Sequence, residues 1–253
     1  MPAQTLDQPL GFMHFLAQSD AVGKALLLML LAMSLLSWYL IVYKGIALWA
    51  RGRRSAKFLN DFWNASSLEQ VAAEISTHGA QDPFSHLTSH ALHAHAHHAK
   101  YGAAKLIEAG TPADFLTRTI RKVLDEETAR LESGLAVLAS IGSTAPFVGL
   151  FGTVWGVYHA LTAIGMKGSA SLETVAGPVG EALIMTGIGL AVAIPAVLGY
   201  NWLTRSNRVL LAQLDAFAYE LFAFLTTGTP LARADGQPRK LQPVSRLNPP
   251  RGA

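Results

Sequence analysis

Three long stretches without Asp, Glu, Lys or Arg constrain the fold of this chain more than any other feature. They cover residues 25–43, 134–160 and 182–204. The first contains 19 residues, and as a helix it would span about 28 Å, close to the hydrocarbon thickness of a bilayer. Only 15% of the chain is charged, and the charges lie mostly between and after these stretches. The sequence therefore predicts an all-α membrane protein with three transmembrane helices.

Basic residues next to these stretches indicate the orientation of the chain. They follow the first and third stretches closely, at Lys44, Arg51, Arg53, Arg54, Lys57, Arg205 and Arg208. Because positive residues stay on the cytoplasmic side, we expect the N-terminus outside the cytoplasm and the C-terminus inside it. Residues 1–23 contain no Lys or Arg, so we expect no cleaved signal peptide. The net charge of +3 is explained by this topology, and nucleic acid is not an expected partner.

Capping and breaking residues predict where the helices begin and end. Ser66, three residues before a glutamate, indicates a capping box. Thr111 followed by Pro112 predicts a strong helix start. No breaker follows until Gly165, so we expect one long helix between Thr111 and Gly165, with its membrane span inside it. Pro178 is expected to open the next helix.

Glu181 is the residue whose position most invites a functional interpretation. It lies at the start of the third stretch, in the run Gly-Glu-Ala-Leu-Ile-Met-Thr-Gly. An ionised carboxylate inside hydrocarbon costs about 2.5–3.5 kcal/mol, so such residues usually face a bundle interior or a path that holds water. There it could take up and release a proton. From the residues alone, the alternative that Glu181 only ends the span at the membrane surface stays open.

The second and third stretches are rich in small and hydroxyl residues. Gly152 and Gly156 have the small-xxx-small spacing that lets helices approach closely. Thr153 and Thr186 carry uncharged hydroxyls that could hold a water wire, although simple packing is an alternative for each. Glu181 and Thr186 are separated by about 140° around an ideal helix. Glu181 could therefore point into a lumen while Thr186 faces the second transmembrane helix.

A run of histidines lies between residues 86 and 98. On a helix, one face would carry His86, His90, His93 and His97, which is a spacing that can bind metal. The surrounding residues include many alanines and no clear carboxylate shell, so a solvated helix face is the favoured interpretation. Adventitious metal binding and a working metal site are the alternatives. His159, near the outer end of the second stretch, is interpreted as an interfacial histidine.

Signatures of enzymes do not occur in a suitable context. The sequence has no cysteine, and it offers no HExxH, GxSxG, Walker or GxGxxG pattern in the required setting. We therefore expect neither catalytic activity nor a cofactor.

Two motifs are highly specific when they occur together. Residues 145–156 read Ala-Pro-Phe-Val-Gly-Leu-Phe-Gly-Thr-Val-Trp-Gly, and residues 176–183 read Ala-Gly-Pro-Val-Gly-Glu-Ala-Leu. With the Thr-Gly-Ile-Gly-Leu run at 186–190, they resemble the MotA/TolQ/ExbB proton-channel family, and its ExbB members more than its TolQ members. The family pattern around the glutamate usually reads Ala-Pro-Gly-Ile-Ala-Glu-Ala-Leu, so Pro178 is displaced by one position here.

The resemblance implies an assembly and a task. It implies a homo-pentamer around a central pore in the bacterial inner membrane, with an ExbD-like subunit passing through the pore. The proton-motive force would then drive a TonB-like protein and energise TonB-dependent outer-membrane uptake. Thr153, Glu181 and Thr186 match the functional polar positions of the family, so the resemblance assigns them to the proton pathway. A TolQ-like motor subunit of the Tol-Pal system is the alternative within the family. A metal transporter with a histidine-rich loop and a non-conducting scaffold are alternatives from other classes.

The stretches, the basic residues and the resemblance together predict the organisation of the whole chain in the lipid bilayer. In order, we expect a periplasmic N-terminal segment (1–24), a first transmembrane helix (25–43), a cytoplasmic helical region (44–133), a second transmembrane helix (134–160), a periplasmic loop (161–177), a third transmembrane helix (178–204), a cytoplasmic helix (205–228) and a disordered basic tail (229–253).

Overall fold

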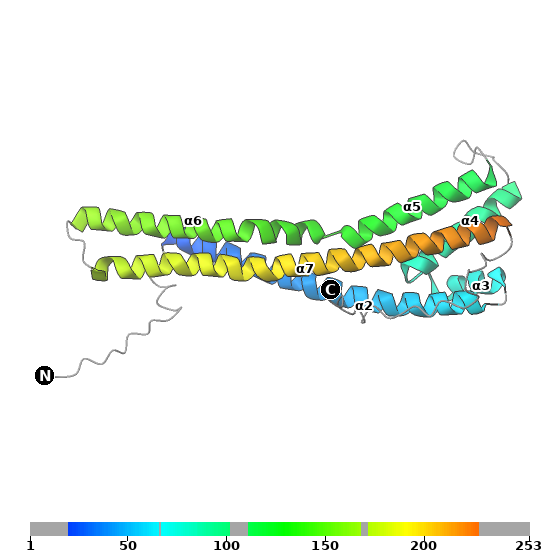
Figure 1. The fold of residues 1–253 in the computed structure, drawn as a ribbon, viewed down its shortest axis with the longest axis horizontal. Helices are drawn as coiled ribbons and strands as arrows, with labels where there is room; N and C mark the ends of the chain where they lie inside the picture. The colour runs from blue at the N-terminus through cyan, green and yellow to red at the C-terminus, as the bar shows by residue number, and fades with distance from the viewer. Residues whose placement is uncertain (1–19, 66, 102–110, 168–171, 228–253) are drawn as a thin grey trace, which may run out of the picture. The chain divides into compact units, whose positions relative to one another are not determined.

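The computed structural model describes residues 20–65, 67–101, 111–167 and 172–227, and the regular structure in these ranges is entirely helical. Figure 1 shows the helices in chain order: α2 (Ala21–Asn64), α3 (Leu68–His78), α4 (Pro83–Tyr101), α5 (Pro112–Glu132), α6 (Leu135–Lys167) and α7 (Leu172–Thr227). The prediction of an all-α protein is confirmed for the described residues.

Three helical segments are long and apolar enough to cross a membrane. They are Ala21–Asn64, Pro112–Met166 and Ala182–Thr227. Each contains one of the charge-free stretches, so the predicted number of candidate spans is confirmed. The exact span limits stay predictions, because α2 and α7 continue without a break well beyond the apolar residues.

The chain divides into two compact units. The described residues within 1–46 and 132–206 form one, here called the apolar unit, and those within 47–131 and 207–253 form the other, here called the polar unit. Both α2 and α7 contribute residues to each unit.

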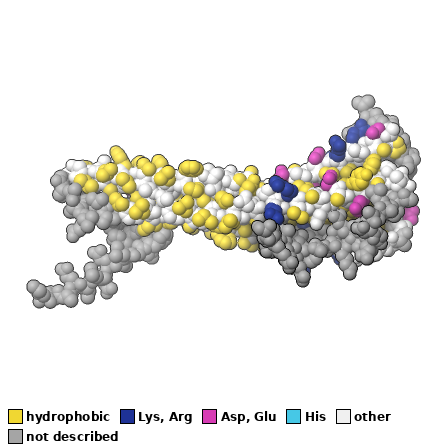
Figure 2. Space-filling view, in the orientation of Figure 1, with side chains coloured by type: hydrophobic (Ala, Val, Ile, Leu, Met, Phe, Trp, Pro, Cys, Tyr) yellow, Lys and Arg dark blue, Asp and Glu magenta, His cyan; other side chains and the backbone are white. Residues whose placement is uncertain are grey.

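The apolar unit packs the first parts of α2 and α7 against α6. Its buried core contains small and medium-sized side chains: Leu30, Ile141, Ala145, Met185, Val192, Ala193 and Ala196. Many large apolar side chains point outward instead, among them Leu35, Phe147 and Leu198. Figure 2 shows hydrophobic side chains spread over the visible face of this unit. An apolar outer face of this kind is stable in lipid, because its apolar surface is not exposed to water there.

The polar unit has a core like that of a soluble helical protein. Aromatic rings meet at its centre, where Phe217 of α7 lies 5.2 Å from Phe62 of α2 and 5.5 Å from Phe84 of α4, centroid to centroid, in edge-on geometry. Helix α5 adds Leu116, Ile120 and Val123 to this core through one buried stripe. Such edge-to-face ring pairs contribute about 0.5–1.5 kcal/mol each beyond their buried area.

The predicted helix start at Thr111 is confirmed. The Thr111 hydroxyl accepts a hydrogen bond from the backbone N–H of Asp114 at 3.2 Å, and the Asp114 carboxylate accepts one from the backbone N–H of Thr111 at 3.1 Å. The Thr111 hydroxyl also donates a hydrogen bond to the Asp114 carboxylate at 2.7 Å, and this bond, followed by the one from the Thr111 backbone N–H, lowers the pKa of Asp114 below its usual value. By contrast, the capping residue of α3 is Ser67, whose hydroxyl accepts from Gln70 N–H at 3.3 Å. The predicted capping residue Ser66 lies outside the described residues.

The expectation of one unbroken helix between Thr111 and Gly165 is wrong. Helix α5 ends at Glu132 and α6 begins at Leu135, because Gly134 has a positive φ of 74°. Glycine adopts this left-handed conformation without the steric penalty that a Cβ atom imposes, which is why it commonly ends helices.

The connection between the second and third spans also differs from expectation. Helix α7 begins at Leu172, so Pro178 lies inside it rather than opening it. The described parts of the predicted 161–177 loop are helical, since α6 runs to Lys167. Residues 168–171, most of the N-terminal segment and the predicted disordered tail lie outside the described residues.

Candidate functional site

The backbones of α6 and α7 touch at a pair of glycines. A Cβ atom added to Gly149 would lie 2.7 Å from the carbonyl oxygen of Met185, and one added to Gly189 would lie 2.7 Å from the carbonyl oxygen of Ala145. Carbon and oxygen atoms that are not bonded do not approach so closely, so only glycine fits at either position. Gly152, from the predicted small-xxx-small pair, meets the side chain of Met185 one turn away. The backbones thus come closest to each other at Gly149 and Gly189, which spacing alone did not single out.

This crossing brings two predicted pathway residues into contact. The hydroxyl oxygens of Thr153 on α6 and Thr186 on α7 are hydrogen-bonded to each other. Both side chains are partly buried. The expectation that Thr186 faces the second transmembrane helix is therefore confirmed, while its role in proton transfer stays a prediction.

Backbone carbonyls complete the surroundings of the two hydroxyls. Thr153 Oγ1 lies 2.9 Å from the carbonyl oxygen of Ala182 and 3.2 Å from that of Gly149. Thr186 Oγ1 lies 3.5 Å from the same Gly149 oxygen. Each hydroxyl carries one proton and can accept another. The pair therefore has more acceptors than protons, and its hydrogen bonds can be arranged in more than one way.

Glu181 lies in helix α7, immediately before Ala182, whose carbonyl oxygen faces Thr153. The Glu181 side chain lies outside the described residues. Its backbone is thus adjacent to the threonine pair along the chain, and the direction of its carboxylate stays a prediction.

A sequence model of the MotA/TolQ/ExbB proton channel family matches residues 81–216, which is more than half of the chain. The chain belongs to this family. The resemblance expected from the motifs around Thr153 and Glu181 is confirmed.

Relatives of both branches of the family cover most of the chain. It is 39% identical over 236 residues to the biopolymer transport protein ExbB of Xanthomonas campestris pv. campestris, covering 90% of this chain and 93% of that protein. It is 40% identical over 202 residues to the ExbB protein of Neisseria meningitidis, covering 80% and 91% of the two chains. The Tol-Pal system protein TolQ of Pseudomonas aeruginosa is 31% identical over 210 residues, covering 83% and 90%.

These identities favour the ExbB interpretation over the TolQ alternative. Together with the three apolar helices, membership of this proton channel family makes the chain a bacterial inner-membrane transport component. The family is not a class of enzymes, in keeping with the sequence analysis.

A second polar cluster in the apolar unit was not predicted. The Asp20 carboxylate caps α2 by accepting the Gly23 N–H at 2.7 Å, and it also accepts the indole N–H of Trp155 on α6 at 2.6 Å. His159 Nε2 lies 3.9 Å from the same carboxylate. Partial burial acts to raise the pKa of Asp20, but the bonds from Gly23 and Trp155 and the nearby His159 outweigh it and lower that pKa. The signal available in the sequence was an aspartate directly before an apolar helix, a common N-cap.

The histidines of α4 do not form a uniform solvated face. His90 and His93 are exposed, as expected, whereas His86 turns toward α5 and meets Glu127. Among the described residues, no group of three or more histidines and carboxylates is placed to hold a metal ion. The structure thus adds no support to the metal interpretation of His86, His90, His93 and His97.

Proposed function

We propose that this chain is the proton-conducting stator subunit of an ExbB–ExbD–TonB-type complex. In this proposal a homo-pentamer surrounds a central pore that holds an ExbD-like subunit. The proton-motive force across the inner membrane drives a TonB-like protein and thereby energises uptake through outer-membrane receptors. The observation that carries the proposal is the contact between the Thr153 and Thr186 hydroxyls, in a chain of a proton channel family.

The proton pathway consists of Glu181 and the threonine pair. Glu181 takes up and releases protons, and an acidic residue of the partner subunit exchanges them with it. The hydroxyls of Thr153 and Thr186 pass a proton or orient the water that does so, because each can accept one proton while giving another. The spare carbonyl acceptors of Gly149 and Ala182 support this, since the hydroxyls can reorient without losing all their partners.

The orientation follows from the basic residues after the first and third spans. The N-terminus lies in the periplasm and the C-terminus in the cytoplasm. The polar unit is then cytoplasmic, which agrees with its charged surface and its core of soluble type.

A Tol-Pal motor subunit is the second candidate function, favoured by the likeness to TolQ proteins. A single pair of complementation assays distinguishes the two. The chain, expressed with its own ExbD-like and TonB-like partners, should restore TonB-dependent uptake of a radiolabelled iron chelate to a strain lacking its own ExbB and TolQ proteins. Restoration of outer-membrane integrity without uptake would favour the Tol-Pal function instead.

The residue assignment is tested in the same strain. Glu181→Gln should abolish uptake while the variant still co-purifies with its partner. Glu74→Gln, at an exposed carboxylate of α3, is the matched control and should restore uptake normally. Full uptake with Glu181→Gln would contradict the proposed role of that carboxylate.

A further inference from the structure

The exposed apolar face of α2 continues beyond Tyr43, the predicted end of the first span. Ile46 and Trp49 are each 63% exposed, and they follow Val42 at intervals of four and three residues. Residues at these intervals share one face of a helix. A contiguous apolar face of this kind needs lipid or another protein to cover it. The face of α2 therefore has to be covered beyond the predicted span as well.

The length of α2 places Trp49 at the level of the lipid headgroups. From Ala25, where the first span is predicted to begin, the helix rises about 36 Å to Trp49 at 1.5 Å per residue. The hydrocarbon layer of a bilayer is about 30 Å thick, and the bilayer with its headgroups about 40–45 Å. In an upright helix Trp49 therefore lies just past the hydrocarbon, where tryptophan rings are enriched.

Basic side chains follow Trp49 in the next two turns of α2. The guanidinium carbon of Arg53 lies over the Trp49 ring, 4.1 Å from its centroid. Side chains of a helix lean toward its N-terminus, so the charge of Arg53 lies back at the level of the ring. A guanidinium stacked on a ring directs its N–H groups outward from its edge, where pairs of them match the oxygens of a phosphate. Arg54 and Lys57 are exposed beside it, and these four residues are here called the α2 patch.

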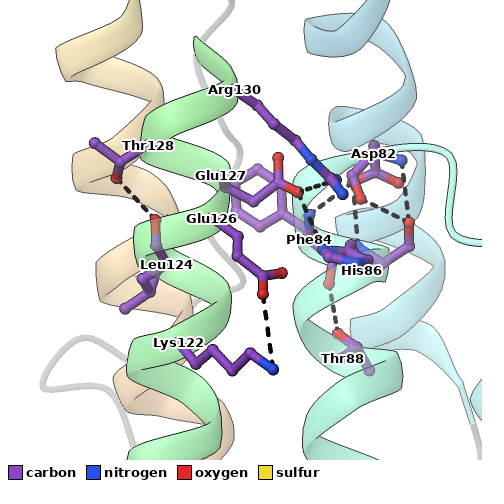
Figure 3. A network of polar contacts seen from close by, with 11 residues as sticks. Asp82, Phe84, His86, Thr88, Lys122, Leu124, Glu126, Glu127, Thr128 and Arg130 are labelled. Carbon is purple, nitrogen blue, oxygen red and sulfur yellow. Dashed lines mark hydrogen bonds and ion pairs between the residues drawn. The ribbon is translucent and has the colours of Figure 1, made fainter. Parts of the chain in front are cut away.

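The charge of the α2 patch is not neutralised by carboxylates. No carboxylate in the described ranges forms an ion pair with its two arginines or its lysine, and α2 carries no Asp or Glu within residues 44–60. The cations of α5 differ in this respect (Figure 3). Arg130 donates a hydrogen bond of 2.7 Å to Glu127, and Lys122 lies 3.9 Å from Glu126. The α2 patch therefore offers its positive charge to a ligand outside the chain.

We propose that the α2 patch binds the phosphate headgroup of an anionic phospholipid. The Trp49 ring lies between the acyl chains and the headgroup, and Arg53 donates hydrogen bonds to the phosphate. Arg54 and Lys57 add attraction for a lipid with a net negative charge. The bound lipid then holds the first span at a fixed depth in the bilayer. The site goes beyond the proposed function and uses from it only the orientation, which places the patch in the cytoplasmic leaflet.

An acidic surface of a protein partner would attract the same three cations. The apolar residues beside them favour lipid, because Val42, Ile46 and Trp49 continue the outward face that the first span presents to acyl chains. Each Lys or Arg near an anionic membrane surface raises the affinity for that surface about fivefold. Lipid is therefore the occupant that fits both halves of the surface, and a protein contact is the competing outcome of the test.

Native mass spectrometry of the full-length protein, purified in detergent together with its partner subunit, tests the proposal. Phosphatidylglycerol and phosphatidylcholine with the same acyl chains are added in equal amounts, and the lipids that the complex retains are counted. The wild type should retain phosphatidylglycerol over phosphatidylcholine by about fivefold or more. Equal retention of the two lipids would overturn the proposal without any variant.

Inorganic phosphate distinguishes a lipid site from a site for a free anion. An excess of phosphate is compared with chloride at the same ionic strength, because salt screens exposed charges in either case. Retention of phosphatidylglycerol should be equal in the two salts. Its specific displacement by phosphate would assign the patch to a free anion and contradict the lipid assignment.

Variants then assign the lipid preference to its residues. Arg53→Gln should lower the retention of phosphatidylglycerol about fivefold. The triple variant Arg53→Gln, Arg54→Gln, Lys57→Gln should remove the preference. Arg53→Lys keeps the charge but not the planar fork, so it should give an intermediate value. Arg121→Gln, at an exposed arginine of α5, is the matched control and should behave like the wild type.

Two results with the triple variant would sink the proposal. One is an unchanged preference for phosphatidylglycerol. The other is loss of the partner subunit with the lipid preference intact, which would assign the α2 patch to a protein contact. Neither readout depends on proton flux, so a failure of the role proposed for Glu181 would leave the lipid result unaffected.

Discussion

Thr153 and Thr186 are separated by 33 positions in the chain, and their hydroxyl oxygens are hydrogen-bonded to each other where α6 crosses α7. The contact is possible because Gly149 and Gly189 let the two backbones touch beside it. The glycines and the threonines thus belong to one arrangement. The glycines allow a short distance between the helices, and the threonine hydroxyls form a hydrogen bond across that distance.

The threonine pair should show energetic coupling. Thr153→Val and Thr186→Val each remove one hydroxyl and leave the other with fewer partners, so each should lower stability by about 1 kcal/mol. The double variant should lose less than the sum of the two, because the contact is lost only once. Thermal unfolding in detergent measures this. Thr162→Val is the control, since its hydroxyl bonds to carbonyls of its own helix. Strict additivity would contradict a direct contact.

The glycine crossing should not tolerate a methyl group. Gly189→Ala would place its Cβ 2.7 Å from a backbone oxygen that cannot move aside, so we expect a loss of about 1–3 kcal/mol. Gly187→Ala is the matched control, because nothing lies within 4 Å of its added Cβ. It should be neutral or slightly stabilising in a helix. Equal stability of Gly189→Ala and the wild type would show that the helices do not cross as described.

The Asp20 cluster predicts a pH dependence at acidic pH. The pKa of Asp20 is lowered in the folded state, so its contribution is present above its unfolded pKa and is lost as the pH falls through its folded pKa. Trp155→Phe removes one hydrogen bond to the carboxylate and should flatten the fall of Tm below about pH 4. Trp202→Phe, an exposed tryptophan of the same unit, is the control. If Tm falls equally steeply with decreasing pH in Trp155→Phe and in the wild type, the hydrogen bond from Trp155 to Asp20 makes no contribution to the acid dependence.

A buried amide should stabilise the end of α5. Asn207 on α7 donates a hydrogen bond at 2.9 Å to the carbonyl oxygen of Leu131, in the last turn of α5. Asn207→Leu leaves that oxygen buried without this donor, and we expect a loss of about 1–3 kcal/mol in chemical unfolding. Asn201→Leu, at an exposed position of the same helix, should change stability by less than about 0.5 kcal/mol.

Local signals in the sequence predicted the helical elements better than their junctions. The charge-free stretches and the cap at Thr111 depend on neighbouring residues, and they were confirmed. The break at Gly134 was missed because a single glycine at the start of an apolar run does not reveal its backbone conformation. Contacts such as Trp155 with Asp20 join residues 135 positions apart, and no periodicity can predict them.

The candidate site was predicted in part for the same reason. The motifs singled out Thr153 and Thr186, and helical geometry allowed Thr186 to face the second span while Glu181 pointed elsewhere. His86 was placed on a solvated face because its helix was considered alone. Its partner Glu127 lies on another helix, 41 positions later in the chain, so only the packed structure brings them together.

Proton flux measures the central claim most directly. The purified complex, reconstituted into liposomes containing a pH-sensitive dye, is exposed to a potassium diffusion potential. In the wild type the lumen should become more acidic, at a rate proportional to the amount of protein reconstituted. Glu181→Gln should reduce this proton flux to that of empty liposomes. Glu74→Gln should match the wild type. Flux through Glu181→Gln equal to that of the wild type would contradict the account.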